Sequence, residues 1–195
     1  MINNFEAKDI AVFFGKTGVG KTSTINTLFD LNWATDNTKA CTSELAFEIH
    51  KPKNKSDILI VDIPGIAESE LADEKFFQEY IKAVSNAGHI IWIFQGDTRV
   101  YRPDQIAILK LKEYFGSDLK FTVCLNQVDL IGKSDWNKTN NTPSPGQLKY
   151  IEEKKRDILD KFNKYIPNLT IGNMIAHSVK YKYNTTKLYN LIINR

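Results

Sequence analysis

Short apolar runs, separated by polar or glycine-containing stretches, recur along the chain. Five of them are almost continuously apolar and rich in β-branched residues, at residues 9–14, 57–62, 89–95, 120–126 and 171–178. Such runs are typical of strands that are covered on both faces in a parallel sheet. A sixth run, residues 45–50 (LAFEIH), alternates instead, as an edge strand with one wet face does. The turn sequence KPKNKS joins it to the run at 57–62, so this pair is predicted to form an antiparallel hairpin.

Helical periodicity fills the intervals between these strands. In residues 73–87, apolar side chains recur at spacings of three and four, so that Phe76, Tyr80 and Val84 would share one face. The other predicted helices cover residues 21–29, 104–115, 147–166 and 186–194. This alternation predicts an α/β fold with a doubly wound, mostly parallel six-stranded sheet and one antiparallel edge strand.

One segment does not follow this alternation of strands and helices. Residues 131–146 (IGKSDWNKTNNTPSPG) are rich in Asn, Thr, Ser and Pro, and we expect them to form a mobile loop. Neither an internal repeat nor an interdomain linker is visible, so residues 1–195 are predicted to form a single domain.

Composition and charge exclude several classes of protein. Apolar residues make up 42% of the chain, which is enough for a core, and the net charge of +3 is well short of that of a typical nucleic-acid binder. Cys41 and Cys124 are far apart and suggest no disulfide framework or metal site. The N-terminus lacks a secretory signal, and no apolar run approaches the roughly 20 residues of a transmembrane segment. We therefore expect a cytoplasmic protein.

The stretch GKTGVGKT, residues 15–22, ends the first predicted strand and opens the first predicted helix. It matches the phosphate-binding pattern G-x-x-x-x-G-K-[ST] in full. Glycines let the backbone wrap closely around an oxyanion, successive N–H groups point into one concavity, and the helix N-terminus adds a partial positive charge. Lys21 can neutralise β- and γ-phosphate oxygens, and the Thr22 hydroxyl can ligate Mg²⁺. The residues predicted to bind the nucleotide here are Gly15, Lys16, Thr17, Gly18, Val19, Gly20, Lys21, Thr22 and Ser23.

Three further motifs follow predicted strands. They are DIPG at residues 62–65, NQVD at 126–129 and SVK at 178–180. The carboxyl ends of strands are where doubly wound sheets bind their ligands. Asp62 can hold a metal-bound water there, and Gly65 can offer its N–H to a γ-phosphate.

The ordered set GKTGVGKT, DIPG, NQVD and SVK resembles the motif series of small GTPases, in the Era-like branch of the translation-factor class. The resemblance spans about residues 9–194 and implies a G domain that binds GTP or GDP with Mg²⁺. It assigns Asp129 to the guanine N1–H and exocyclic amine, and Asn126 to the base edge. Ser178, with the main chain of Val179 and Lys180, is assigned to the guanine O6.

The base motifs depart from the family pattern at two positions. Gln127 stands where the family has a lysine whose stem covers the base, and Val179 stands where it has an alanine. Gln127 is still counted among the predicted base-binding residues, because it keeps an alkyl stem. The loss of the lysine charge predicts a weaker affinity.

The resemblance also implies two switches. The first lies in residues 31–44, where Thr42 is the predicted ligand of Mg²⁺ and sensor of the γ-phosphate, with Thr38 and Thr35 as rivals. The second follows Gly65, where Ile66 replaces the glutamine that orients the attacking water in many small GTPases. Other candidates for a catalytic role are Glu68, Ser69, Glu70, Arg99 and Arg102. The predicted catalytic residues are Lys21, Gly65 and Thr42, and the predicted metal ligands are Thr22, Thr42 and Asp62.

Functions of different classes are compatible with these residues. The first is a switch that binds GTP or GDP with Mg²⁺ and hydrolyses GTP slowly, because Ile66 cannot hydrogen-bond a water. The second is a nucleotide-bound interaction or assembly module with little or no turnover. A third, an ATP-using phosphotransferase, is disfavoured by Asp129. The expected partners are a guanine nucleotide and either a second copy, in a nucleotide-dependent homodimer, or a protein effector. No nucleic-acid-binding domain is evident.

Overall fold

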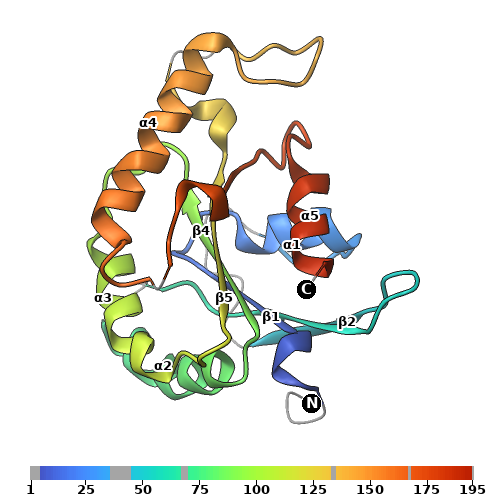
Figure 1. Cartoon of the computed structure of the whole chain (residues 1–195), viewed down its shortest axis with the longest axis vertical. Helices are drawn as coiled ribbons and strands as arrows, with labels where there is room; N and C mark the ends of the chain where they lie inside the picture. The colour runs from blue at the N-terminus through green and yellow to red at the C-terminus, as the bar shows by residue number, and fades with distance from the viewer. Residues whose placement is uncertain (1–4, 36–44, 67–69, 133–134, 167, 195) are drawn as a thin grey trace.

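A computed structural model describes residues 5–35, 45–66, 70–132, 135–166 and 168–194. A six-stranded sheet with the order β2-β3-β1-β4-β5-β6 crosses the molecule (Figure 1). β2 pairs with β3 in antiparallel register, and the remaining pairs are parallel, as predicted. The strands are β1 Ile10–Phe14, β2 Ala46–His50, β3 Ile58–Asp62, β4 His89–Gln95, β5 Lys120–Asn126 and β6 Met174–Ala176.

Helices cover both faces of this sheet. Figure 1 shows α2, α3 and α4 on one face and α1 and α5 on the other. The helices are α1 Lys21–Phe29, α2 Glu70–Ser85, α3 Arg102–Leu111, α4 Pro145–Phe162 and α5 Thr185–Ile193. The doubly wound α/β prediction is therefore confirmed.

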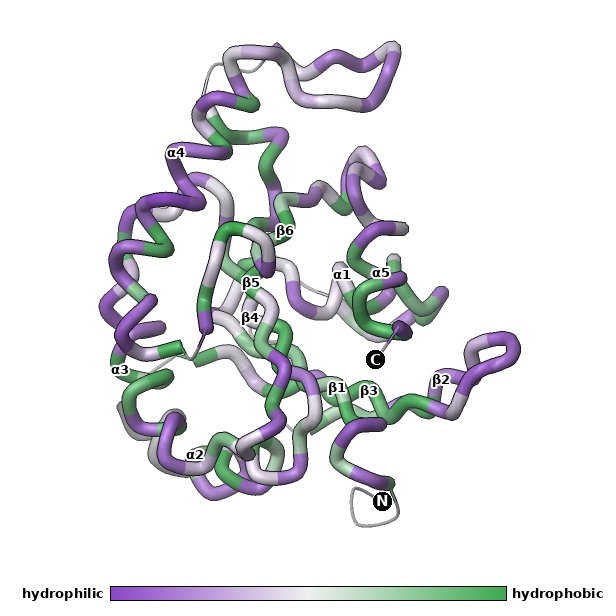
Figure 2. Tube along the Cα trace, in the orientation of Figure 1, coloured by the Kyte–Doolittle hydropathy of each residue, from purple (hydrophilic) through white to green (hydrophobic). Residues whose placement is uncertain are grey.

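The core lies on both sides of the sheet because successive strand residues point to opposite faces. In β1, Val12 and Phe14 pack toward α2, α3 and α4, while Ala11 and Phe13 pack toward α1 and α5. Every residue of β1 and β3 is buried, and apart from Asp62 at the end of β3 both strands are continuously apolar (Figure 2).

Aromatic rings and one thiol occupy the centre of the sheet. Trp92 of β4 stacks on Phe14 with ring centroids 5.2 Å apart and an interplanar angle of 6°. On its other side it stacks on Phe121 at 6.2 Å and 16°. Cys124 lies in the middle of β5 on the face toward α1 and α5, with no exposed surface, and burial raises the pKa of its thiol.

Most elements differ from the sequence-based prediction by a few residues at their ends, and three segments differ for a clear local reason. The strand predicted at residues 171–178 is reduced to β6, because Ile171–Asn173 form a 3₁₀ turn that caps the strand's start. α4 begins at Pro145, two residues earlier than predicted, because Ser144 and Gln147 form a capping box. Within the predicted loop 131–146, Asn137 and Thr142 exchange two main-chain hydrogen bonds and close a hairpin. The mobility of this segment stays a prediction.

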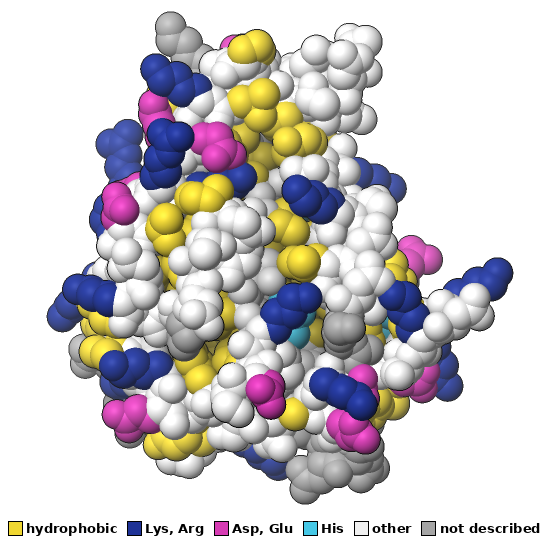
Figure 3. Space-filling view, viewed as in Figure 1, with side chains coloured by type: hydrophobic (Ala, Val, Ile, Leu, Met, Phe, Trp, Pro, Cys, Tyr) yellow, Lys and Arg dark blue, Asp and Glu magenta, His cyan; other side chains and the backbone are white. Residues whose placement is uncertain are grey.

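Charged side chains are spread over the surface. Figure 3 shows basic and acidic groups interspersed on one face rather than gathered in a single basic patch. Among the helices of the described residues, none combines the length and apolar character needed to cross a bilayer.

Candidate nucleotide-binding site

The loop between β1 and α1 has the backbone that a phosphate cradle requires. Gly15, Gly18 and Gly20 all adopt positive φ angles, of 145°, 81° and 86°. A side chain at Gly20 would collide with the Asn126 amide, whereas nothing lies within 4 Å of a Cβ placed at Gly18. Gly20 is the N-cap of α1, so Lys21, Thr22 and Ser23 form the first turn, where main-chain N–H groups have no acceptor within the helix and favour an anion.

Lys21 folds back over this loop. Its ammonium donates to the carbonyl oxygens of Gly15 at 3.1 Å and Lys16 at 3.4 Å, and the side chain is 7% exposed. A cation held over a cradle of main-chain amides suits a polyphosphate.

Thr22 and Asp62, two of the three predicted metal ligands, lie in contact. The Thr22 hydroxyl donates to Asp62 Oδ2 at 2.6 Å, which joins the start of α1 to the end of β3. A hydroxyl and a single carboxylate are hard oxygen ligands of the kind that Mg²⁺ takes alongside phosphate oxygens. Within the described ranges, no group of three or more His, Cys, Asp or Glu side chains could hold a metal by itself.

Gly65 and Ile66 lie directly against the phosphate loop. A Cβ at Gly65 would come within 2.6 Å of the Thr17 main-chain nitrogen, so only glycine allows this approach. The Ile66 N–H donates to the Gly15 carbonyl at 3.3 Å, and Ile66 pairs with Lys16 in a short parallel bridge. The Ile66 side chain is 2% exposed and belongs to the core.

The Lys16 ammonium is engaged by the segment that connects β4 to α3. It donates to the Val100 carbonyl at 2.6 Å and to Thr98 Oγ1 at 3.3 Å, and it lies 3.7 Å from Asp104 Oδ2. Any contact of Lys16 with a phosphate would therefore come from its main chain rather than from its ammonium.

Asn126 fastens the predicted base-binding loop to the phosphate loop. Its Nδ2 donates to the Val19 carbonyl at 2.9 Å. Its Oδ1 is buried and has no hydrogen-bond partner among the described residues, so a donor on a ligand could satisfy this acceptor. The next residue, Gln127, has a φ of 59°, and its Nε2 lies 3.9 Å from the place of a Cβ at Gly20.

Asp129 and Ser178, predicted to contact the base from different loops, lie together. The Ser178 hydroxyl donates to Asp129 Oδ1 at 2.6 Å, and both residues are buried. Val179 and Lys180 follow in the adjacent turn, where the Lys180 ammonium lies 5.1 Å from the centroid of the Tyr181 ring. The structure thus brings the predicted phosphate-side and base-side residues to the same edge of the sheet.

Two polar residues that support this edge were not predicted from the sequence. Gln147 is fully buried, and its Nε2 donates to the carbonyl oxygens of Asp129 and Ile131, both at 3.2 Å. His177 Nε2 lies 3.2 Å from Thr24 Oγ1, and burial lowers the pKa of His177 to about 4, so the imidazole is neutral. The pattern S-x-x-Q at residues 144–147 could have identified Gln147 as a capping residue, but not its contact with Asp129.

Several predicted residues lie outside the described part of the chain. Thr42, Thr38, Glu68 and Ser69 are among them. Thr35, Arg99 and Arg102 are described and exposed.

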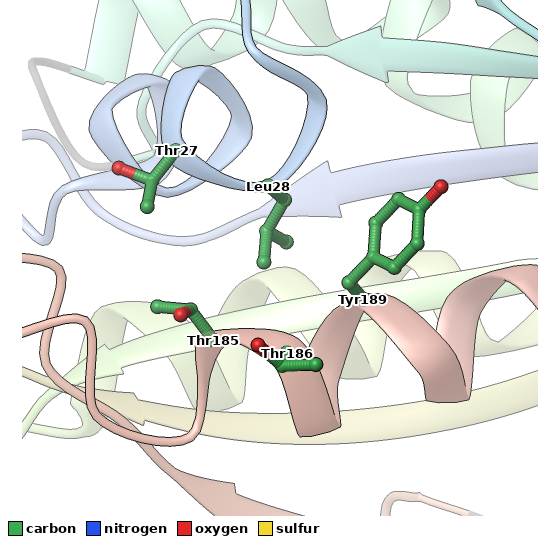
Figure 4. A pocket seen from close by; sticks show the side chains of 5 residues that line it. All are labelled: Thr27, Leu28, Thr185, Thr186 and Tyr189. Atoms are coloured by element: carbon green, nitrogen blue, oxygen red, sulfur yellow. The ribbon is translucent and has the colours of Figure 1, made fainter.

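A hollow on the α1 and α5 face is separate from this site. It has a volume of about 200 Å³ and lies between α1 and α5 (Figure 4). Its lining residues are Thr27, Leu28, Thr185, Thr186 and Tyr189, none of which is a predicted site residue.

Comparison with known proteins identifies the family. Residues 10–127, more than half of the chain, match the family described as 50S ribosome-binding GTPase. The chain belongs to this GTPase family. The predicted resemblance to Era-like GTPases is confirmed, and membership of the family implies a guanine nucleotide and Mg²⁺ as ligands.

Among curated proteins, the chain is similar to the uncharacterized protein YkfA of Escherichia coli (strain K12). The two are 31% identical over 107 residues, which cover 53% of this chain and 36% of YkfA. The matched region thus spans about a third of the length of this relative.

Solved structures of Era and of EngB, a probable GTP-binding protein, share the fold at low sequence identity. A structure of Era in complex with MgGDPNP and a segment of 16S ribosomal RNA has a TM-score of 0.72 and 17% identity, over 95% of this chain and 56% of Era. A structure of EngB has a TM-score of 0.67 and 18% identity, over 95% of this chain and 98% of EngB.

Proposed function

We propose that residues 1–195 form one G domain, which binds GTP or GDP with Mg²⁺ and acts as a slowly hydrolysing switch. One observation carries the proposal: the Asn126–Val19 hydrogen bond joins the phosphate loop to the loop of Asp129, so both ends of one nucleotide face the same edge. A site that bound only phosphate would need no buried Asp129–Ser178 pair, whereas a site for a whole guanine nucleotide uses it to bind the base.

In this proposal each residue acts on a defined part of the nucleotide. Main-chain N–H groups of residues 15–23 and the Lys21 ammonium hold the phosphates. Thr22 and Asp62 would hold Mg²⁺, which when bound neutralises charge on the β- and γ-phosphate oxygens. Gly65, which lies against Thr17, would offer its N–H to the γ-phosphate.

The base is selected by hydrogen-bond polarity. The Asp129 carboxylate can only accept hydrogen bonds, so it matches the two donors of guanine and repels the acceptor N1 of adenine. Asn126 Oδ1 offers a further acceptor, and the turn at Val179 and Lys180 provides main-chain donors for the guanine O6.

The buried, apolar side chain of Ile66 supports slow GTP hydrolysis. The side chain lies in the core and has no group that could orient an attacking water. The same observation supports a second candidate function, a nucleotide-bound assembly module with little or no turnover, acting as a nucleotide-dependent homodimer or on a protein effector.

The first test measures nucleotide affinity by calorimetry with GTP, GDP and ATP, each with and without Mg²⁺. We expect guanine nucleotides to bind at least about 100-fold more tightly than ATP, since the mismatch leaves buried polar groups unpaired. Lys21→Ala should lose guanine nucleotide binding, and Asp129→Ala should lose the preference for guanine. Asp135→Ala, which removes an exposed carboxylate nearby, should change neither. Equal affinity for ATP would contradict the proposal.

The second test separates the switch from the assembly module. In a single-turnover assay, we expect phosphate release with a rate constant on the order of 10⁻⁴ to 10⁻² s⁻¹, the range of intrinsic rates of unassisted GTPases. Turnover of many GTP molecules per second by the isolated chain would refute slow hydrolysis. Tight GTP binding with no phosphate release would favour the assembly module.

A further inference from the structure

Trp136 lies beside the proposed base-binding residues, in the segment that follows Asp129. Its side chain is 7% exposed, although the neighbouring residues Asp135 and Asn137 are exposed. The indole stacks on the Tyr181 ring with centroids 5.0 Å apart and an interplanar angle of 21°. It also meets the Tyr183 ring edge-on, at 5.5 Å and 85°. Aromatic pairs of this geometry stabilise beyond their buried area, by about 0.5–1.5 kcal/mol each.

The two tyrosines belong to the loop of residues 178–183, which carries Ser178. The Tyr181 N–H donates to Ser178 Oγ at 3.3 Å. Ser178 and Tyr183 exchange two main-chain hydrogen bonds, of 3.1 and 3.0 Å. The Trp136 ring, which contacts both tyrosines, is therefore connected to Ser178 by two routes. One passes through the Tyr181 N–H and the other through the main chain of Tyr183.

Ser178 in turn holds the carboxylate that selects guanine in the proposed function. Its hydroxyl donates to Asp129 Oδ1 at 2.6 Å. The contacts thus run in series from Trp136 through the tyrosines and Ser178 to Asp129. A change in the indole can reach the carboxylate through this series of contacts.

We propose that Trp136 is a positioning residue for guanine selection, acting on Asp129 through Tyr181, Tyr183 and Ser178. The proposal rests on the proposed function, because it assumes that Asp129 reads the base. Gln147 fixes the Asp129 main chain from α4, and Trp136 fixes the loop that orients the Asp129 side chain. Together they hold Asp129 at its main chain and, through Ser178, at its carboxylate.

The proposal predicts that a change at Trp136 affects recognition of the guanine base and not binding of the phosphates. Among the described residues, the aromatic contacts of Trp136 are with Tyr181 and Tyr183 and not with the phosphate loop. That loop is held instead by the Asn126 side chain, at the Val19 carbonyl, and by the Ile66 N–H, at the Gly15 carbonyl. Loosening the indole should therefore weaken recognition of the guanine donors without altering the grip on the phosphates. A hydrogen bond to a charged group contributes about 1.5–3 kcal/mol, so one lost bond corresponds to a tenfold or larger loss of affinity.

The test compares GDP with inosine diphosphate, which has the same phosphates but lacks the exocyclic amine. Calorimetry on the full chain should show that Trp136→Ala lowers the affinity for GDP by about tenfold or more and the affinity for inosine diphosphate by less, because Asp129 meets two donors of guanine but only the N1–H of hypoxanthine. The ratio of the two affinities should therefore fall toward one. Trp136→Phe keeps an aromatic face and should restore most of the ratio. Tyr181→Leu breaks the same stack from the other side and should lower the ratio as Trp136→Ala does. Tyr114→Ala, which removes an exposed tyrosine after α3, serves as the control.

Several results would overturn the proposed role of Trp136. An unchanged ratio in Trp136→Ala, or equal losses for both nucleotides, would show a purely structural role and overturn the inference. If Trp136→Ala does not fold, a ratio preserved in Tyr181→Leu would overturn it equally. A wild-type chain that does not prefer GDP over ATP would instead overturn the proposed function, and this inference with it.

Discussion

Asp104 is a carboxylate with no exposed surface at the start of α3. Its Oδ1 accepts a hydrogen bond from Trp92 Nε1 at 3.0 Å, and Lys16 of the phosphate loop lies 3.7 Å from Oδ2. Burial raises the pKa of Asp104 from the ordinary 3.8 to about 6, although the Trp92 and Lys16 contacts act in the opposite direction. His177 shows the reverse case, since burial lowers its pKa from 6.5 to about 4.

These two groups predict opposing effects of pH on stability. The folded state holds the Asp104 proton more tightly than the unfolded state, so this contribution is present below pH 3.8 and is lost as the pH rises through about 6. The neutral His177 contributes above pH 6.5, and its contribution is lost as the pH falls toward 4. Each is at most about 3 kcal/mol, and between pH 4 and 6 they offset one another.

Urea unfolding between pH 4 and 7 would measure this balance. In Asp104→Asn, the free energy of unfolding should fall more steeply with acid than in the wild type, because only the His177 contribution remains. In His177→Gln it should fall less steeply. If the free energy of unfolding of Asp104→Asn changed with pH in parallel with that of the wild type, the raised pKa of Asp104 would be contradicted.

At the same scale, the sequence identifies motif residues better than it identifies their partners. Thr22, Asp62, Asn126 and Asp129 each follow from a residue type at a fixed spacing after a strand. The direction of the Lys16 ammonium does not, because spacing gives the place of the main chain but not which neighbouring loop a long side chain reaches. The contact of Trp136 with Tyr181 joins residues 45 positions apart, and neither lies in a motif.

At the scale of elements, periodicity predicts type well because burial decides it. β1 and β3 are buried on both faces and are apolar throughout except for Asp62, and β4 and β5 match their predicted bounds of 89–95 and 120–126. β2 is half-buried along its length, which agrees with its alternating sequence.

Element ends are predicted less well because local capping decides them. β6 has only three residues, since Asn173 turns back to bond the Thr170 main chain and its neighbours enter a 3₁₀ turn. Apolar residues at 171 and 175 belong to one run in the sequence but to two elements in the structure. Hydrophobicity alone does not distinguish a buried turn from a buried strand.

At the scale of the whole molecule, the sheet order places every proposed ligand-binding loop at one edge. β1 lies between β3 and β4, so the phosphate loop is flanked by the loop of Asp62 on one side and by the β4–α3 connection on the other. This arrangement follows from right-handed crossovers between parallel strands. The sequence predicts it because strand order is constrained once the alternation of strands and helices is known.

Because Cys124 is buried in the sheet, the rate at which its thiol is modified measures how often the sheet opens. A thiol with no exposed surface in β5 can react with an alkylating reagent only after the strand leaves its neighbours. In a Cys41→Ser chain, we expect slow modification under native conditions, and guanine nucleotide should slow it further by about the factor 1 + [L]/Kd. Modification as rapid as in urea would refute this expectation. Mass spectrometry of the alkylated chain could then follow ligand affinity and opening of the sheet in one time course.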